Sequence, residues 1–102
     1  MEGKIREPIN EERQRQIEKE GWTAEHDEQH CFGTLALAGA CYAINHYSEA
    51  NHLAAYYHNW AYDHWPWDDK WWKPSKDPIR NLAKAGALIA AEIDRLQRQG
   101  KG

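Results

Sequence analysis

Cationic side chains gather around the start of a predicted helix in the stretch WWKPSKDPIR. Lys73 and Lys76 precede the helix, and Arg80 lies in its first turn. Free backbone N–H groups, the positive end of the helix dipole and nearby cations together favour an anion, most often a phosphate. Ser75 adds a hydroxyl group, whereas the carboxylate of Asp77 competes for the same N–H groups. These residues form the first candidate for a binding site.

Tryptophan is abundant beside these cations, with six in 102 residues against a single phenylalanine. Indole rings can stack on nucleobases, which is worth about 1–3 kcal/mol per base. A phosphate site beside an aromatic wall is therefore a simple form of nucleotide recognition. The expected stacking residues are Trp65, Trp67, Trp71, Trp72, Tyr56 and Tyr57. The alternative is that the tryptophans fill the core and the lysines contact only solvent.

A second candidate is the sequence HDEQH, in which His26 and His30 lie four residues apart. If this stretch is helical, both imidazoles fall on one face, and Asp27 or Glu25 completes a site for a divalent metal such as Mg²⁺ or Mn²⁺. Such a metal could activate water for hydrolysis of a phosphoanhydride. The alternative is a polar connector whose histidines orient the chain through hydrogen bonds.

The other histidines and the two cysteines form no ligand pattern. The remaining histidines recur every six residues, at His46, His52, His58 and His64. This spacing suits neither a helix nor a strand, so we expect no metal shared by all four. Cys31 and Cys41 lack a CxxC partner, and we expect both to be small, buried and reduced.

The clearest element that positions these residues is a helix that begins after Asp77. Asp77 is a suitable N-cap, Pro78 suits the first helical position, and Gly100 follows the predicted end. Its apolar residues follow 3-4-3-4-3 spacing, at Ile79, Leu82, Gly86, Ile89, Ile93 and Leu96. This is a heptad seam with a glycine that permits close approach of another helix. The seam faces either the core of the same chain or a second subunit.

Two earlier helices are predicted. The first begins at Asn10, with acidic residues in its first turn, and ends at Gly21. The second begins near Gly33 and Thr34, is rich in alanine, and breaks near residues 48–50. The small residues of this second helix allow another helix to pack closely against it.

The tryptophan-rich segment that follows is predicted to be non-helical because Pro66 and Pro74 disfavour helix at the residues before them. We expect an all-α fold, a small bundle of three to four helices with an irregular Trp-rich loop. The bundle forms one domain over residues 1–102, with residues 1–9 and 99–102 as flexible ends. A chain this short buries only about 60–65% of its unfolded surface, so we expect it to form a homo-oligomer.

The net charge of −3 conceals a gradient along the chain: −4 over residues 1–30, −4 over 31–69, and +5 over 70–102. A duplex nucleic-acid binder presents a broad basic face, so this pattern argues against one. It favours a local anion site or contact between oppositely charged parts of two subunits. No apolar run approaches the about 20 residues of a membrane span, and no signal-peptide pattern is present. We expect a cytoplasmic protein that does not contact membranes.

Four motifs carry a family resemblance: ERQRQIEKEGWTAEHDEQH, GTLALAGACYA, WPWDDKWWKPS and DPIRNLAKAGALIAAEIDRL. Together they span about Asn10 to Arg98. The chain resembles a family of small proteins of tailed phages and prophages, often described as the N-terminal domain of dATP/dGTP diphosphohydrolase. The stretch INHYSEANHLAAYYHNWAYDH departs from the usual pattern. The resemblance implies a phage origin, an infected bacterial cytoplasm and a connection to nucleotides.

Catalysis by the chain is a separate question. Helical pyrophosphohydrolases of the MazG type carry EExxE and ExxD motifs, but here Glu11-Glu12 is followed by Arg13, and Glu92 and Asp94 are two residues apart. Our first hypothesis is therefore a binding protein without a cofactor. It would capture a nucleotide or a nucleotide-derived immune signal, of the cyclic nucleotide or ADP-ribose type. The alternatives are a Mg²⁺- or Mn²⁺-dependent nucleotide diphosphohydrolase, and a module that binds a host protein through its tryptophans.

Overall fold

The computed structural model describes residues 2–22, 33–52 and 60–100. Its long helices are α1 (Glu2–Glu20), α3 (Thr34–Ala50) and α5 (Pro78–Arg98), and a short 3₁₀ turn, η1, spans Asp69–Trp71. Residues 60–64 are also helical, and these described ranges contain no strand. The predicted all-α fold is confirmed. No helix within the described ranges is long and apolar enough to cross a membrane.

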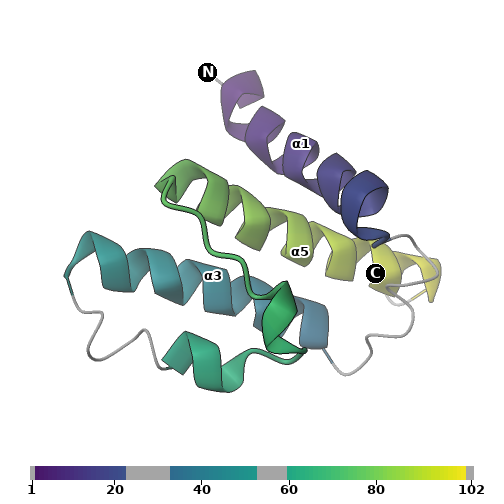
Figure 1. The fold of residues 1–102 in the computed structure, drawn as a ribbon. Helices are drawn as coiled ribbons and strands as arrows, with labels where there is room; N and C mark the ends of the chain where they lie inside the picture. Colours follow the sequence, from purple (N-terminus) through teal and green to yellow (C-terminus); the bar gives the residue numbers. More distant parts are fainter. Residues whose placement is uncertain (1, 23–32, 53–59, 101–102) are drawn as a thin grey trace.

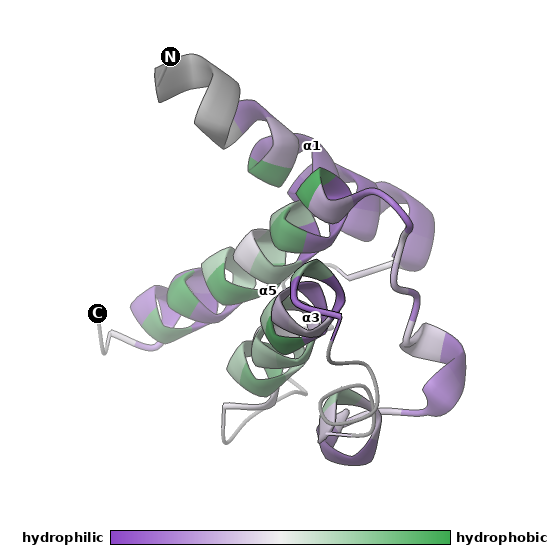
Figure 2. Ribbon diagram, turned by 90° about the vertical axis from the view of Figure 1, so that its left-hand side faces the viewer, coloured by the Kyte–Doolittle hydropathy of each residue, from purple (hydrophilic) through white to green (hydrophobic). Residues whose placement is uncertain are grey.

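Helix α5 lies in the middle of the molecule, with α1 along one flank and α3 along the other (Figure 1). Helices α3 and α5 run antiparallel, and the chain between residues 60 and 77 covers one side of this layer (Figures 1 and 2). We call residues 60–77 the tryptophan segment. This arrangement brings the start of α5, the tryptophan segment and α1 together.

The predicted boundaries of α5 are confirmed. The side chain of Asp77 caps the helix by accepting a hydrogen bond of 3.0 Å from the backbone N–H of Ile79, and Pro78 is the first helical residue. At the other end, Gly100 adopts a left-handed φ of 74°. Both signals are local, which is why the sequence alone predicts this helix.

Close packing of α3 on α5 depends on Gly39. A Cβ atom at this position would lie 3.0 Å from the backbone oxygen of Ala85 and 3.1 Å from Cγ1 of Ile89. The backbones therefore approach one another at a glycine, as the small residues of this helix predict. Helix α3 begins at Thr34 and ends at Ala50, which confirms the expected break.

The heptad seam of α5 is not the core of this chain. Ile79 is 63% exposed, and three further seam residues are 45–50% exposed, namely Leu82, Ile89 and Ile93. The core lies on other faces of α5, at residues such as Leu88 and Ala91. Of the two alternatives that the sequence left open, a core within the chain is contradicted for these four residues, because a period of 3.5 identifies an apolar stripe but not what covers it.

Helix α1 begins at Glu2, so the predicted start at Asn10 is also wrong. The helix continues through Pro8, and Ile9 packs against α5 at Gly86, where a Cβ atom would lie only 2.8 Å from Cδ1 of Ile9. Tertiary contact thus extends the helix beyond its local start signal. Gly86, the glycine of the seam, therefore allows close approach of α1 and not of a second subunit.

The tryptophan segment is largely irregular, as predicted. Helical residues 60–64 precede Pro66, and the only other helical part of the segment is η1. The side chain of Asp68 caps η1 by accepting a hydrogen bond of 3.0 Å from the backbone N–H of Lys70.

Candidate functional site

The tryptophans of the segment pack together on α3. Trp65 and Trp22 are buried, and Tyr42 of α3 lies among them. The ring centroids of Tyr42 and Trp72 are 4.7 Å apart, and those of Trp65 and Trp67 are 5.3 Å apart in an edge-to-face arrangement. We call the following residues the aromatic cluster: Trp22, Tyr42, Trp65, Trp67, Trp71 and Trp72. Most of its ring surface is used for packing, which is the alternative that the sequence left open.

The cluster retains an accessible edge at Trp71. Its indole is partly buried, and the ammonium groups of Lys70 and Lys73 each lie 5.4 Å from the ring centroid. This separation is within the range of a cation–π interaction. Lys70, Lys73 and Lys76 are all exposed. One aromatic ring and the two lysines Lys70 and Lys73 therefore share this edge of the segment.

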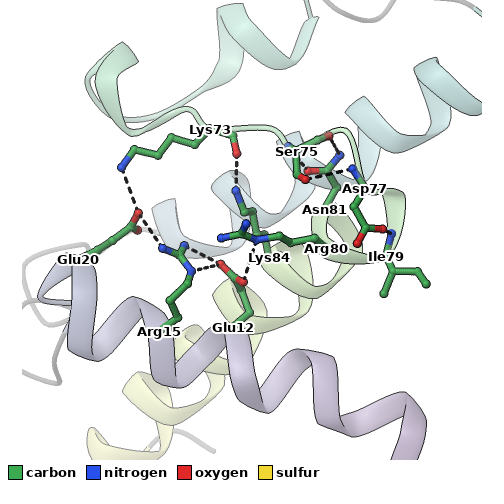
Figure 3. A network of polar contacts seen from close by, with 10 residues as sticks. All are labelled: Glu12, Arg15, Glu20, Lys73, Ser75, Asp77, Ile79, Arg80, Asn81 and Lys84. Carbon is green, nitrogen blue, oxygen red and sulfur yellow. Dashed lines mark hydrogen bonds and ion pairs between the residues drawn. The ribbon is translucent and has the colours of Figure 1, made fainter.

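A polar network joins the segment to α1 (Figure 3). Glu12, only 6% exposed, contacts Arg15 at 2.6 Å and Arg80 at 3.5 Å. Glu20 contacts Arg15 at 3.5 Å and Lys73 at 3.3 Å. Two of the predicted phosphate ligands, Lys73 and Arg80, are therefore paired with carboxylates of α1.

The buried Lys84 lies at the inner end of this network. Its ammonium group donates a hydrogen bond to the backbone oxygen of Lys73 and lies 5.5 Å from the ring centroid of Tyr42. Burial lowers the pKa of Lys84, and the neighbouring charge of Arg80 lowers it further, while Glu12 acts in the opposite direction. Tyr42 fixes the same residue of the segment, because its hydroxyl accepts a hydrogen bond of 3.1 Å from the backbone N–H of Lys73.

Ser75 and Asn81 hold the chain at the entrance to α5 (Figure 3). The backbone N–H of Ser75 donates to Oδ1 of Asn81, and Nδ2 of Asn81 donates to the backbone oxygen of Ser75, both at 2.7 Å. The hydroxyl of Ser75 accepts from the backbone N–H of Asp77 at 3.0 Å. The carboxylate of Asp77 itself accepts the hydrogen bond from the backbone N–H of Ile79. Side chains of the protein thus already use part of the anion site predicted here.

Two hollows adjoin the start of α5. A cavity of about 390 Å³ between α1 and α5 is lined by Pro8, Glu11, Glu12, Arg15, Asp77, Ile79, Arg80 and Ala83. A smaller one of about 250 Å³ is lined by His46, Glu49, Ala50, Lys76 and Pro78. The predicted ligands Arg80 and Lys76 lie in different hollows, and neither hollow is lined by a tryptophan. The described members of the predicted set therefore do not gather in one of these two hollows.

Several predicted residues lie outside the described ranges. These are the stacking candidates Tyr56 and Tyr57, the metal candidates Glu25, His26, Asp27 and His30, and Cys31. Within residues 2–22, 33–52 and 60–100, no group of three or more His, Cys, Asp or Glu side chains could hold a metal ion. Cys41 is buried as predicted, and burial raises the pKa of its thiol to about 11.

The sequence did not single out Glu12, Arg15, Glu20 and Asn81, which position the segment. Only Asn81 carries a local signal, as an amide in the first turn of a capped helix, where it can bond back to the preceding loop. Comparison with models of known families finds no match, and comparisons with curated proteins and with solved structures find none either.

Proposed function

We propose that this protein binds an anionic nucleotide or nucleotide-derived molecule at the edge of the aromatic cluster, where Trp71 meets Lys70 and Lys73. The observation that carries the proposal is the placement of both ammonium groups 5.4 Å from the centroid of one partly buried indole. A base that stacks on Trp71 would take the place of these ammonium groups. The displaced ammonium groups of Lys70 and Lys73 would then contact the phosphates of the same ligand.

The contacts of Lys73 support such an exchange. Its ammonium is 3.3 Å from Glu20, and its side chain is 52% exposed. The Glu20 side chain is only 9% exposed, but it also pairs with Arg15 at 3.5 Å, so this carboxylate keeps a cationic partner when a phosphate competes for Lys73. The backbone of Lys73 is held independently, by Tyr42 and Lys84. The side chain can therefore change partner while the segment keeps its position.

The family resemblance suggests a role for this binding. A phage protein that holds a cyclic nucleotide or an ADP-ribose derivative would remove a signal of bacterial immunity from solution. Such a role requires affinity and many copies of the protein, and it requires no bond to be broken. Arg80 and Lys76, in the two neighbouring hollows, are further groups that an extended ligand could reach.

The test is a binding titration of linear, cyclic and ADP-ribose-type nucleotides against wild type and the double variant Lys70→Gln/Lys73→Gln. We expect the double variant to bind at least about 10-fold more weakly, because it loses two charge-assisted contacts. The control is Lys19→Gln, which removes an exposed lysine in the last turn of α1. Equal affinity of the double variant and the control, or no binding by wild type, would overturn the proposal.

A further inference from the structure

An apolar face lies on the side of the α3–α5 layer that is opposite the tryptophan segment. On α5, Lys84 and Asn81 contact the segment, whereas the exposed residues of the heptad seam are on the other side of the helix, beside Gly86, where Ile9 of α1 packs. On α3, Tyr42 contacts the segment, and the far side carries the exposed Tyr47. Figure 2 shows that α3 and α5 carry most of the hydrophobic residues of the ribbon, whereas the segment beside them is mainly hydrophilic.

Each helix contributes one row of residues to this face. The row on α5 consists of Ile79, Leu82, Ile89 and Ile93. The row on α3 has the same alternation of three and four and consists of Ala36, Ala40, Ala43, Tyr47 and Ala50. Ile89 lies beside Gly39, where the two helices meet, so the rows are neighbours. Two heptad rows on adjacent antiparallel helices match the packing surface of half a four-helix bundle.

We propose that this apolar face packs against the same face of a second copy of the chain, so that two α3–α5 pairs form a two-fold symmetric four-helix bundle. A second copy is favoured because no residue in either row is charged. A symmetric contact brings identical surfaces together, and a charged row would place like charges opposite one another. An uncharged row carries no such penalty.

The size of the face also fits a dimer. Tyr47 and the four residues of the α5 row are 45–63% exposed. Side chains of this size then present on the order of 100 Å² each, which gives about 500 Å² per copy and about 1,000 Å² in a dimer before the alanines are added. Specific interfaces begin at about this total area. A patch of about 500 Å² is at the size of the largest apolar patch on a typical protein, and such patches are often functional.

Sedimentation equilibrium from micromolar to millimolar protein tests this proposal. We expect the average mass of wild type to rise from 11.9 kDa to twice that value. Leu82→Lys and Ile93→Lys, made separately, change side chains that are 45% and 50% exposed, so the monomer should keep its fold. Each puts two lysines into a two-fold interface and should raise the dimer dissociation constant at least about 100-fold.

The matched control is Tyr62→Lys, which replaces a side chain that is 47% exposed in the tryptophan segment, on the opposite side of the layer. Its dimer affinity should equal that of wild type, and circular dichroism should show the same helix content in all variants. A wild type that stays at the monomer mass throughout would overturn the proposal. So would Leu82→Lys and Ile93→Lys variants that dimerise as tightly as the control.

Discussion

Replacement of Glu12 by glutamine tests the network that holds α1 to the tryptophan segment. Glu12 is 6% exposed, and its carboxylate lies 2.6 Å from Arg15 and 3.5 Å from Arg80. Glutamine keeps the volume and one acceptor oxygen but removes the negative charge. Arg15, Arg80 and the buried Lys84 would then surround a neutral amide.

The magnitude follows from these contacts. A hydrogen bond to a charged group contributes about 1.5–3 kcal/mol, and removal of one partner of a fully buried pair is destabilising by about 3–5 kcal/mol. The side chains of Arg15 and Arg80 are 30% and 47% exposed, so water partly replaces the lost carboxylate. We therefore expect a loss of about 2 kcal/mol of unfolding free energy, which lowers Tm by about 10 °C in a domain of this size.

Urea unfolding followed by tryptophan fluorescence measures this loss. The control is Glu11→Gln, the same substitution at the preceding, exposed position, where we expect a change below about 0.5 kcal/mol. If Glu12→Gln and Glu11→Gln unfold at the same urea concentration, the network does not stabilise the fold and the reasoning is refuted.

Three further predictions concern the core. Gly39→Ala should lose about 1 kcal/mol of stability in urea unfolding although alanine favours helix, because the new Cβ would lie 3.0 Å from the backbone oxygen of Ala85; an unchanged or raised urea midpoint would contradict this. Burial raises the pKa of Tyr42 from 10.0 to about 12, so the folded state loses stability as the pH rises from 10 towards 12. Urea titrations should show this loss to be about 2 kcal/mol smaller in Tyr42→Phe, and equal losses in the two proteins would refute it. Cys41, whose thiol pKa is raised to about 11 by burial, should react with a thiol reagent only as fast as the protein unfolds; rapid labelling under native conditions would contradict its burial.

The sequence predicts α5 correctly because its boundary signals are local. Asp77, Pro78 and Gly100 lie within a few residues of the positions that they specify. The irregular tryptophan segment follows from similar local signals, Pro66 and Pro74. Capping and proline effects act over one helical turn, so a single sequence contains them completely.

The polar network could not be predicted because its contacts are distant in sequence. Lys73 and Glu20 are separated by 53 residues, and only the packing of α1 on α5 brings them together. The sequence presents α1 as a highly charged helix, and nothing in it indicates that Glu12 is buried. The same limit applies to the tryptophans, whose number suggests either a core or a binding wall. The structure places most of their surface in the core and leaves Trp71 at the edge.

The most direct test of nucleotide binding is native mass spectrometry of wild-type protein with linear, cyclic and ADP-ribose-type nucleotides, with and without Mg²⁺ or Mn²⁺. We expect one class of nucleotide to remain bound, intact and at a defined stoichiometry, whether or not metal is present. Protein that retains none of these ligands would contradict the account. Ligand that is consumed with release of pyrophosphate only when metal is present would also contradict it, and would identify the chain as a hydrolase.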